Sequence, residues 1–424
     1  MLDRLNSLQN DIRVAIVGTG AMGKGLLYQC HITSGIKCIA IADIRPDRAV
    51  ACAEWLGLDY RIASDLKTVH EVIRQGSVAV CEDGDLLARC EFVDVLIESS
   101  NAIGAAARYA ATALEFQKHL VLMNAEIDLI FGPYLLDLAT RKGVVYTSCD
   151  GDQHIVIKRL IDDIRLWGFE LVMAGNIKGF LDRYANPETI ASEADKRNLD
   201  YRMCASYTDG TKLNIEMALV ANATNLSTLT PGMNGPRANN IGEVFHHFDF
   251  HALWKSGQPW VDYLLGAEPK GGVFVIGYCG NEYQKTMLRY YKMGDGPFYL
   301  FYRPYHLCHV EAITCIVKAF LDGHSFLKPT FGFRTNVYSY AKRTLHKGEE
   351  LDGIGGYTSY GLIENQAAND SNPGLPICLA DKVRLKRDVK KDEKILLDDV
   401  DYDSTSFEFD LYSKALGCSG KRVS

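Results

Sequence analysis

Three glycines, Gly18, Gly20 and Gly23, stand between an apolar run rich in β-branched residues and a stretch of helical composition. In such a turn the first glycine permits a tight bend and the second lets the backbone approach a pyrophosphate. The third lets the helix pack closely on the strand, and the free N–H groups of the helix attract phosphate. Asp43 follows about twenty residues later, at the end of the next apolar run. The pattern predicts a dinucleotide-binding βαβ unit.

Two side chains bear on which dinucleotide binds. Asp43 would accept hydrogen bonds from the ribose hydroxyls, which favours NAD. Arg45, two residues on, would instead pair with the 2′-phosphate of NADP if Asp43 turned aside. Both cofactors therefore stay open. Met22 lies inside the same turn and belongs to the predicted cofactor-binding set.

Polar residues also follow the later predicted strands. Ser99 comes after the fourth, and Asn124 and Glu126 come after the fifth. Ligands of open α/β sheets bind at the carboxyl ends of the strands, so these three are predicted near the nicotinamide. The alternative is ordinary loop and helix-cap chemistry.

Candidate catalytic residues lie further along the chain. Lys178 follows directly on an apolar strand, and Asp209 and Lys212 flank an Asp-Gly turn that leads into a helix. A lysine can polarise a carbonyl or give it a proton as hydride arrives, and a carboxylate can hold that lysine. The alternative for Asp209 and Lys212 is an ion pair combined with a helix cap.

Other clusters admit two interpretations. Arg183 and Arg237 could bind a phosphate or carboxylate of the substrate, or form salt bridges. His306 and His309 have the spacing of metal ligands on a helix, although the aromatic residues beside them favour packing. The histidines of residues 246–251 favour an amphipathic surface. Whether the protein binds a metal therefore stays open.

The pattern of elements sets the fold class. Strands alternate with helices up to Asp150, which predicts α/β architecture with a doubly wound parallel Rossmann sheet. The spacing then changes to a mixed α/β (α+β) region, and from Thr335 to short strands around glycine-rich turns. The predicted domains are residues 11–150, 151–334 and 335–412.

Composition excludes several classes of protein. The formal net charge of −7 gives no basic excess of the kind that a nucleic-acid binder shows. No apolar run approaches the roughly 20 residues of a membrane-spanning helix. The first residues lack the features of a signal peptide, and the 12 cysteines form no Cys-x-x-Cys pair. We expect a cytoplasmic protein with reduced thiols, acting on a small molecule.

Three segments carry a resemblance to a known family. They are residues 174–184 (Ala-Gly-Asn-Ile-Lys-Gly-Phe, then Asp-Arg-Tyr), 208–216 (Thr-Asp-Gly-Thr-Lys-Leu-Asn-Ile-Glu) and 301–309 (Phe-Tyr-Arg-Pro-Tyr-His-Leu-Cys-His). With the β-rich tail, they resemble homoserine-dehydrogenase-like oxidoreductases that end in an SAF module. The best-understood relatives are deoxyxylulose-phosphate-reductoisomerase-like enzymes. The likeness spans about residues 11 to 402.

The resemblance implies a Rossmann domain, a central catalytic and dimerising domain, and an SAF-like tail. It implies NADPH as reductant, a homodimer, Asp209 and Lys212 as catalytic acid and lysine, and Lys178 as a second lysine. The expected function is hydride transfer to or from a small polyhydroxylated carbonyl compound, possibly phosphorylated. One alternative is the conversion of 1-deoxyxylulose 5-phosphate to methylerythritol 4-phosphate. An alternative of another class is a non-catalytic nucleotide or ligand sensor.

Overall fold

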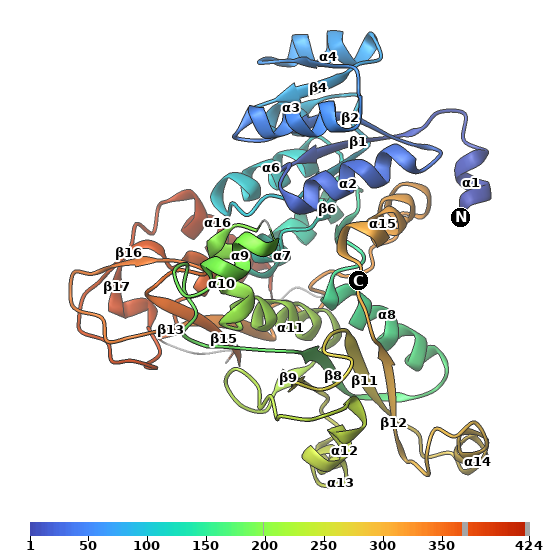
Figure 1. Cartoon of the computed structure of the whole chain (residues 1–424), viewed down its shortest axis with the longest axis vertical. Helices are drawn as coiled ribbons and strands as arrows, with labels where there is room; N and C mark the ends of the chain where they lie inside the picture. The colour runs from blue at the N-terminus through green and yellow to red at the C-terminus, as the bar shows by residue number, and fades with distance from the viewer. Residues whose placement is uncertain (198, 367–371, 420–424) are drawn as a thin grey trace. The chain divides into compact units, whose positions relative to one another are not determined.

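The computed structural model describes residues 1–197, 199–366 and 372–419 (Figure 1). The chain forms two compact units. The first comprises Met1–Asp152, Leu307–Lys328 and the described residues from Leu411 onward, and the second comprises Gln153–His306 and Pro329–Asp410.

The first unit is built on a parallel sheet whose strand order is β3-β4-β2-β1-β5-β6-β7. The order runs in both directions from β1, which pairs with β2 on one side and β5 on the other. This doubly wound α/β arrangement confirms the predicted fold class. The strands are β1 (Ile12–Val17), β2 (Ile36–Ala42), β3 (Tyr60–Ile62), β4 (Val78–Cys81), β5 (Val95–Glu98), β6 (His119–Leu122) and β7 (Tyr146–Ser148).

Crossover helices connect these strands, because parallel neighbours cannot be joined by a tight turn. Pro46 opens α3, where its missing N–H costs nothing. Asn124 and Gly143 cap the two ends of α7. The helices are α1 (Leu2–Asn6), α2 (Ala21–Ile32), α3 (Pro46–Trp55), α4 (Leu66–Arg74), α5 (Gly84–Arg89), α6 (Gly104–Glu115) and α7 (Ala125–Lys142).

One helix of the first unit comes from far along the chain. α15 (Cys308–Asp322) lies within the predicted central segment but packs beside α2 (Figure 1). Its residues Ala312, Cys315 and Ile316 are fully buried in the core that also holds Leu26 and Leu27 of α2. Burial of this apolar face places the helix in the first unit, while the predicted domain boundaries remain predictions.

The second unit contains a five-stranded sheet of order β12-β11-β8-β10-β9. β8 runs parallel to β10, and β10 runs parallel to β9. β11 is antiparallel to both β8 and β12, so this sheet combines parallel and antiparallel strands, in a region where the sequence predicted helices and strands together. The strands are β8 (Glu170–Lys178), β9 (Ser227–Thr228), β10 (Trp260–Leu265), β11 (Val273–Tyr278) and β12 (Phe298–Arg303).

The two faces of this sheet are covered differently. The Phe274 ring lies over Gly175, where an added Cβ would come within 2.2 Å of it. Phe274 packs with Phe248 and Phe250, which belong to the segment of the short helices α12 (Val244–His247) and α13 (Phe250–Leu253).

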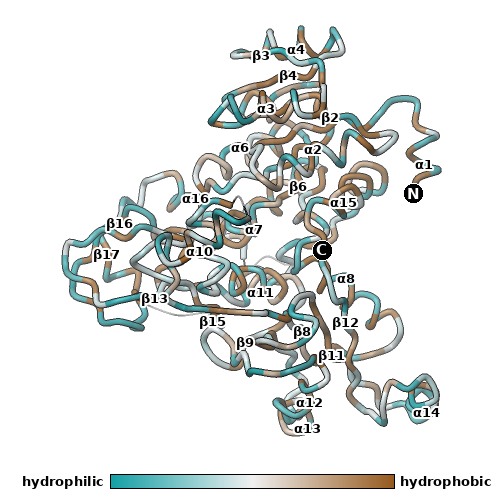
Figure 2. The backbone as a smooth tube through the Cα atoms, viewed as in Figure 1, coloured by the Kyte–Doolittle hydropathy of each residue, from teal (hydrophilic) through white to brown (hydrophobic). Residues whose placement is uncertain are grey.

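The long helices α8 and α11 also contact the sheet. α8 spans Gln153–Leu166 and α11 spans Thr211–Thr224. Every residue of α11 is buried, including its lysine and its glutamate, so this helix is the centre of the second unit. Figure 2 shows the apolar β11 mainly in brown and the exposed helix α14 (Glu282–Tyr290) mainly in teal.

Polar side chains of α11 bind the backbone of β15 (Ser359–Asn365). Thr211 Oγ1 accepts a hydrogen bond from Gly361 N at 2.9 Å, and Asn214 Oδ1 accepts one from Ile363 N at 2.9 Å. Both donors belong to β15, which pairs through its other edge with β13 (Thr335–Ala341). The side chains of α11 therefore satisfy backbone donors that would otherwise be buried without partners.

The β-rich segment confirms the strand character predicted from residue 335, and its likeness to an SAF module stays a prediction. None of the helices among the described residues is long and apolar enough to cross a membrane. The remaining elements are α9 (Ala191–Arg197), α10 (Tyr201–Thr208), β13 (Thr335–Ala341), β14 (Glu350–Asp352), β15 (Ser359–Asn365), β16 (Asp381–Leu385), β17 (Val400–Asp401) and α16 (Phe407–Cys418).

Candidate active site

The glycine turn joins β1 to α2 in the first unit. Gly18 has φ +88°, and an added Cβ would lie 2.6 Å from Ser100 N. A Cβ on Gly23 would lie 1.8 Å from Gly18 O, so helix and turn touch there. Gly20 differs, because it caps α2 and its added Cβ would meet nothing within 4 Å. Two glycines are thus required for packing, and the third leaves open space before the helix N-terminus.

Side chains hold this turn in place. The Ser99 hydroxyl lies within hydrogen-bond distance of two backbone carbonyls, Val17 O at 2.9 Å and Gly18 O at 2.8 Å. Met22 packs half-buried against the core of the sheet. The structure therefore shows Ser99 and Met22 in supporting positions, and their contact with a cofactor stays a prediction.

Asp43 lies at the end of β2, beside the turn, and is buried. Its Oδ2 accepts hydrogen bonds from Thr19 N at 2.8 Å and Thr19 Oγ1 at 2.9 Å. Its Oδ1 accepts one from Arg45 N at 2.9 Å. The Arg45 side chain is exposed and forms an ion pair with Asp47 at 3.2 Å. Each carboxylate oxygen can accept about two hydrogen bonds, so Asp43 can fix the turn and still accept one from a ribose hydroxyl.

Glu98 is the residue that sequence reasoning left without a role. It ends β5, its side chain is fully buried, and one carboxyl oxygen accepts hydrogen bonds from Ser100 N at 3.0 Å and from the Ser100 hydroxyl. The other oxygen has no hydrogen-bond partner among the described residues. Burial raises the pKa of Glu98 to about 8, the hydrogen bonds from Ser100 and the nearby amide of Asn124 lower it, and the charge of Glu126 raises it. The carboxyl is therefore largely protonated near neutral pH. The sequence signal was an acidic residue closing an otherwise apolar strand.

Asn124 caps the helix that follows β6. Its Oδ1 accepts a hydrogen bond from Ile127 N at 3.2 Å, and its Nδ2 donates one to Ala102 O at 2.7 Å. The helix-cap alternative considered for this residue is therefore what the structure shows. Glu126 is buried in the first turn of the same helix. Both residues lie at the carboxyl edge of the sheet, close to Glu98.

Asp209 in the second unit forms a buried ion pair that the sequence did not predict. Its Oδ2 lies 2.9 Å from Lys342 Nζ, and both side chains are almost inaccessible to solvent. Lys342 Nζ also donates hydrogen bonds to Ala185 O at 2.6 Å and Gly356 O at 2.8 Å. Asp209 Oδ1 accepts from Thr211 N at 2.7 Å. Burial raises the pKa of Asp209, and the charge of Lys342 lowers it. The partner was missed because it lies more than a hundred residues away.

The two predicted lysines lie on elements of the second unit that contact each other. Lys212 is buried in the first turn of α11, and Glu216 lies one turn further on the same face. Lys178 ends β8, where it pairs in register with Leu265 of β10. α11 packs against both strands. The sequence therefore identified a lysine on the central helix and a lysine at the end of a strand beneath it.

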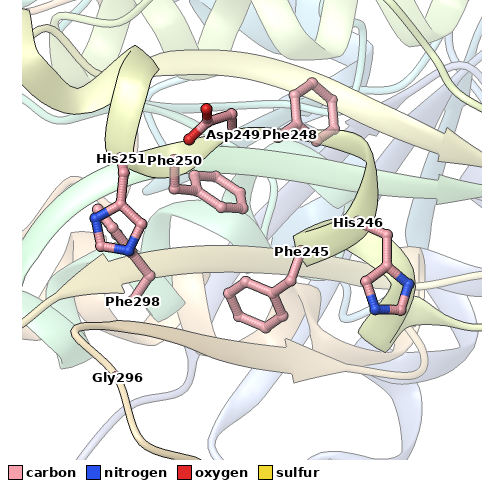
Figure 3. A pocket seen from close by; sticks show the side chains of 8 residues that line it. All are labelled: Phe245, His246, Phe248, Asp249, Phe250, His251, Gly296 and Phe298. Atoms are coloured by element: carbon pink, nitrogen blue, oxygen red, sulfur yellow. The ribbon is translucent and has the colours of Figure 1, made fainter.

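The histidine cluster of residues 246–251 is amphipathic, as favoured from the sequence. Phe248 and Phe250 are buried, whereas His246 and His251 are exposed. They line a surface cavity of about 380 Å³ with other aromatic residues (Figure 3). The two imidazoles stand at opposite sides of that view, so they do not form one metal site.

The family comparison bears on the second unit. Residues 151–312 match the family model described as "Oxidoreductase DRL, catalytic domain". Residues 151–312 are therefore similar to the catalytic domain of an oxidoreductase, in line with the prediction for the chain. The match contains Lys178, Asp209 and Lys212, whose roles it does not assign. The comparison with curated proteins found no match.

Several solved structures are similar to parts of the chain at low identity. One is a DOX-P reductoisomerase in complex with NADPH, fosmidomycin and magnesium, at 13% identity and a TM-score of 0.34 over 49% of this chain and 57% of that chain. Another is a probable dehydrogenase from Thermotoga maritima, at 11% identity and 0.40 over 74% and 90%. A third is a putative homoserine dehydrogenase from Archaeoglobus fulgidus, at 19% and 0.33 over 50% and 68%. Likenesses this distant carry no argument about ligands or substrates.

The buried ion pair gives a first prediction. Lys342→Met leaves the Asp209 carboxylate buried without its counter-charge, which should lower the free energy of unfolding by about 3–5 kcal/mol. Adding Asp209→Asn removes that charge and should restore most of the loss. Urea denaturation followed by tryptophan fluorescence measures both variants. A wild-type midpoint for Lys342→Met alone would contradict the assigned pair.

Glu98 gives a second prediction, on pH. Because the folded protein binds the proton of Glu98 more tightly than the unfolded chain does, ionisation of this carboxyl costs stability as pH rises from about 4.5 to about 8. Glu98→Gln cannot ionise, so its melting temperature should gain on that of the wild type across this window and the difference should then level off. The exposed Glu71→Gln serves as control, with a flat difference. A flat difference for Glu98→Gln as well would show that the carboxyl is not held protonated.

Proposed function

We propose that this oxidoreductase transfers a hydride between a nicotinamide dinucleotide and a small polyhydroxylated carbonyl compound, possibly phosphorylated. The observation that carries the proposal is the glycine turn, whose Gly20 side leaves open space in front of a helix N-terminus. Two glycines there are needed by the protein's own packing and one is not, as expected where a pyrophosphate approaches the backbone.

The first unit holds the dinucleotide in this proposal. The amides at the start of α2 bind the pyrophosphate, and Asp43 accepts a hydrogen bond from the adenosine ribose while it fixes Thr19. Arg45 is the residue that would pair with a 2′-phosphate, so NAD and NADP are both tested. Ser99, Asn124 and Glu126 support the carboxyl edge of the sheet where the nicotinamide lies. The reduced nicotinamide supplies the hydride.

The second unit supplies the acid chemistry. In the reduction direction, hydride adds to the carbonyl carbon and the oxygen takes a proton, which Lys178 or Lys212 donates as an ammonium group. The positive charge also stabilises the developing alkoxide. Asp209 is a positioning residue in this account, because its hydrogen bond from Thr211 N and its ion pair with Lys342 fix the start of α11.

Lysine variants test this assignment. Lys178→Ala and Lys212→Ala should each lower turnover by at least a hundredfold, because general-acid help contributes on this scale. Affinity for the dinucleotide should change by less than about tenfold, or 1.4 kcal/mol. Turnover is followed by nicotinamide absorbance with NADH and NADPH, using sugar-derived carbonyl compounds, homoserine and 1-deoxyxylulose 5-phosphate. The exposed Lys255→Ala, in the same unit, is the matched control.

Two results would change the proposal. Full turnover in both lysine variants would remove them from catalysis. Tight dinucleotide binding with no turnover on any compound would favour the sensor alternative. The predicted homodimer is tested separately by light scattering. The assignment of the two lysines does not depend on the oligomeric state.

A further inference from the structure

The carboxyl ends of β8 and β10 share a polar face. Tyr263 pairs in register with Asn176, and Leu265 pairs with Lys178. Arg237 in turn forms a parallel bridge with Leu265. Register partners in adjacent strands present their side chains on the same face, and residues two apart in one strand do so too. Asn176, Lys178, Tyr263 and Arg237 therefore lie on one face of the sheet.

That face is distinct from the aromatic one. Gly175, which alternates with Asn176 along β8, lies under the Phe274 ring on the side of the phenylalanine core. Asn176 consequently points to the opposite side of the sheet. The predicted catalytic Lys178 shares its side.

Asn176 is the unusual member of this set. Its side chain is 1% exposed, and neither Oδ1 nor Nδ2 has a hydrogen-bond partner in the described part of the chain. Burying an amide without partners costs free energy, so a protein keeps such a group chiefly where something else satisfies it. An unpartnered acceptor beside an unpartnered donor matches a hydroxyl group, which can both donate and accept.

Two guanidinium groups influence the pKa of the neighbouring Tyr263. Burial and the charge of Asp262 raise the pKa of the Tyr263 hydroxyl, and the positive charges of Arg183 and Arg237 lower it. Both arginines therefore lie near the phenol. The guanidinium carbon of Arg183 also lies 5.4 Å from the centre of the Tyr360 ring, which is a cation–π contact.

No carboxylate in the described part of the chain pairs with either guanidinium. Within residues 1–197, 199–366 and 372–419, Arg183 and Arg237 form no ion pair, and both are exposed. Arginine offers a planar fork of donors that fits the oxygens of a phosphate or a carboxylate. Two such groups beside a buried amide have the chemistry of a site for a hydroxylated anion.

We propose that Arg183 and Arg237 bind the anionic group of the substrate, and that Asn176 binds a hydroxyl group of the same molecule. The inference rests on the proposed function and narrows its substrate class to hydroxylated phosphates or carboxylates. Lys178, on the same face, then lies on the side of the sheet where the bound molecule carries its carbonyl. Arg183, Arg237 and Asn176 select the substrate and take no part in proton transfer.

Calorimetry with simple probes tests the anion site on the full chain. Glycerol 3-phosphate and glycerate present the two anions on a hydroxylated carbon chain, and glycerol lacks the charge. We expect binding of at least one anion and none of glycerol, with the stronger of the two identifying phosphate or carboxylate. Arg183→Gln and Arg237→Gln should each weaken that binding at least tenfold, whereas Arg61→Gln on the edge strand β3 should not change it. The inference would be overturned if the wild type bound neither anion, or if both site variants bound the anion with wild-type affinity.

Asn176→Leu separates ligand binding from structural support. If the amide is kept for a ligand, replacing it with an apolar group of similar size should leave the melting temperature unchanged or raised and weaken probe binding. A lowered melting temperature with unchanged binding would assign it a structural role and overturn its part of the inference. Dinucleotide binding measured in the same variants should stay at the wild-type value. The anion site can thus fail while the oxidoreductase proposal stands, and the lysine variants can fail while the anion site stands.

Discussion

The first unit depends on a tight contact between α2 and the glycine turn that precedes it. Gly23 meets Gly18 O so closely that an added Cβ would lie 1.8 Å away, and Gly18 itself adopts a left-handed φ against the backbone at Ser100. Ser99 and Asp43 anchor the two sides of this contact through hydrogen bonds. The result is a helix N-terminus fixed at the carboxyl edge of the parallel sheet, with its free amides turned to open space at Gly20.

The second unit depends on a different arrangement, a central helix that carries polar groups into the interior. α11 satisfies backbone donors of β15 through Thr211 and Asn214, and its N-terminus is fixed by Asp209, which is paired with Lys342. A helix held by so many directed bonds has little freedom to shift. Lys212 therefore has a defined position, as the proposed transfer of a proton to a bound carbonyl requires.

The sequence predicted local features well. The alternation of strands and helices gave the doubly wound sheet, and the glycine spacing gave the turn, because both follow from short-range patterning. Contacts between distant residues could not be predicted. Nothing local relates Asp209 to Lys342, or α15 to α2, since only the folded chain brings them together. The burial of single polar side chains could not be predicted either. The raised pKa of Glu98 and the lack of hydrogen-bond partners for Asn176 are therefore seen only in the structure.

Gly20→Ala tests the central claim most directly, because its methyl group would occupy only the space assigned to the pyrophosphate. Calorimetric titration with NADH and NADPH should show at least tenfold weaker binding than the wild type, at an unchanged melting temperature. Gly271→Ala, whose added Cβ also meets nothing within 4 Å, should bind as the wild type does. Wild-type affinity in Gly20→Ala, or no binding of either dinucleotide to the wild type, would contradict the account.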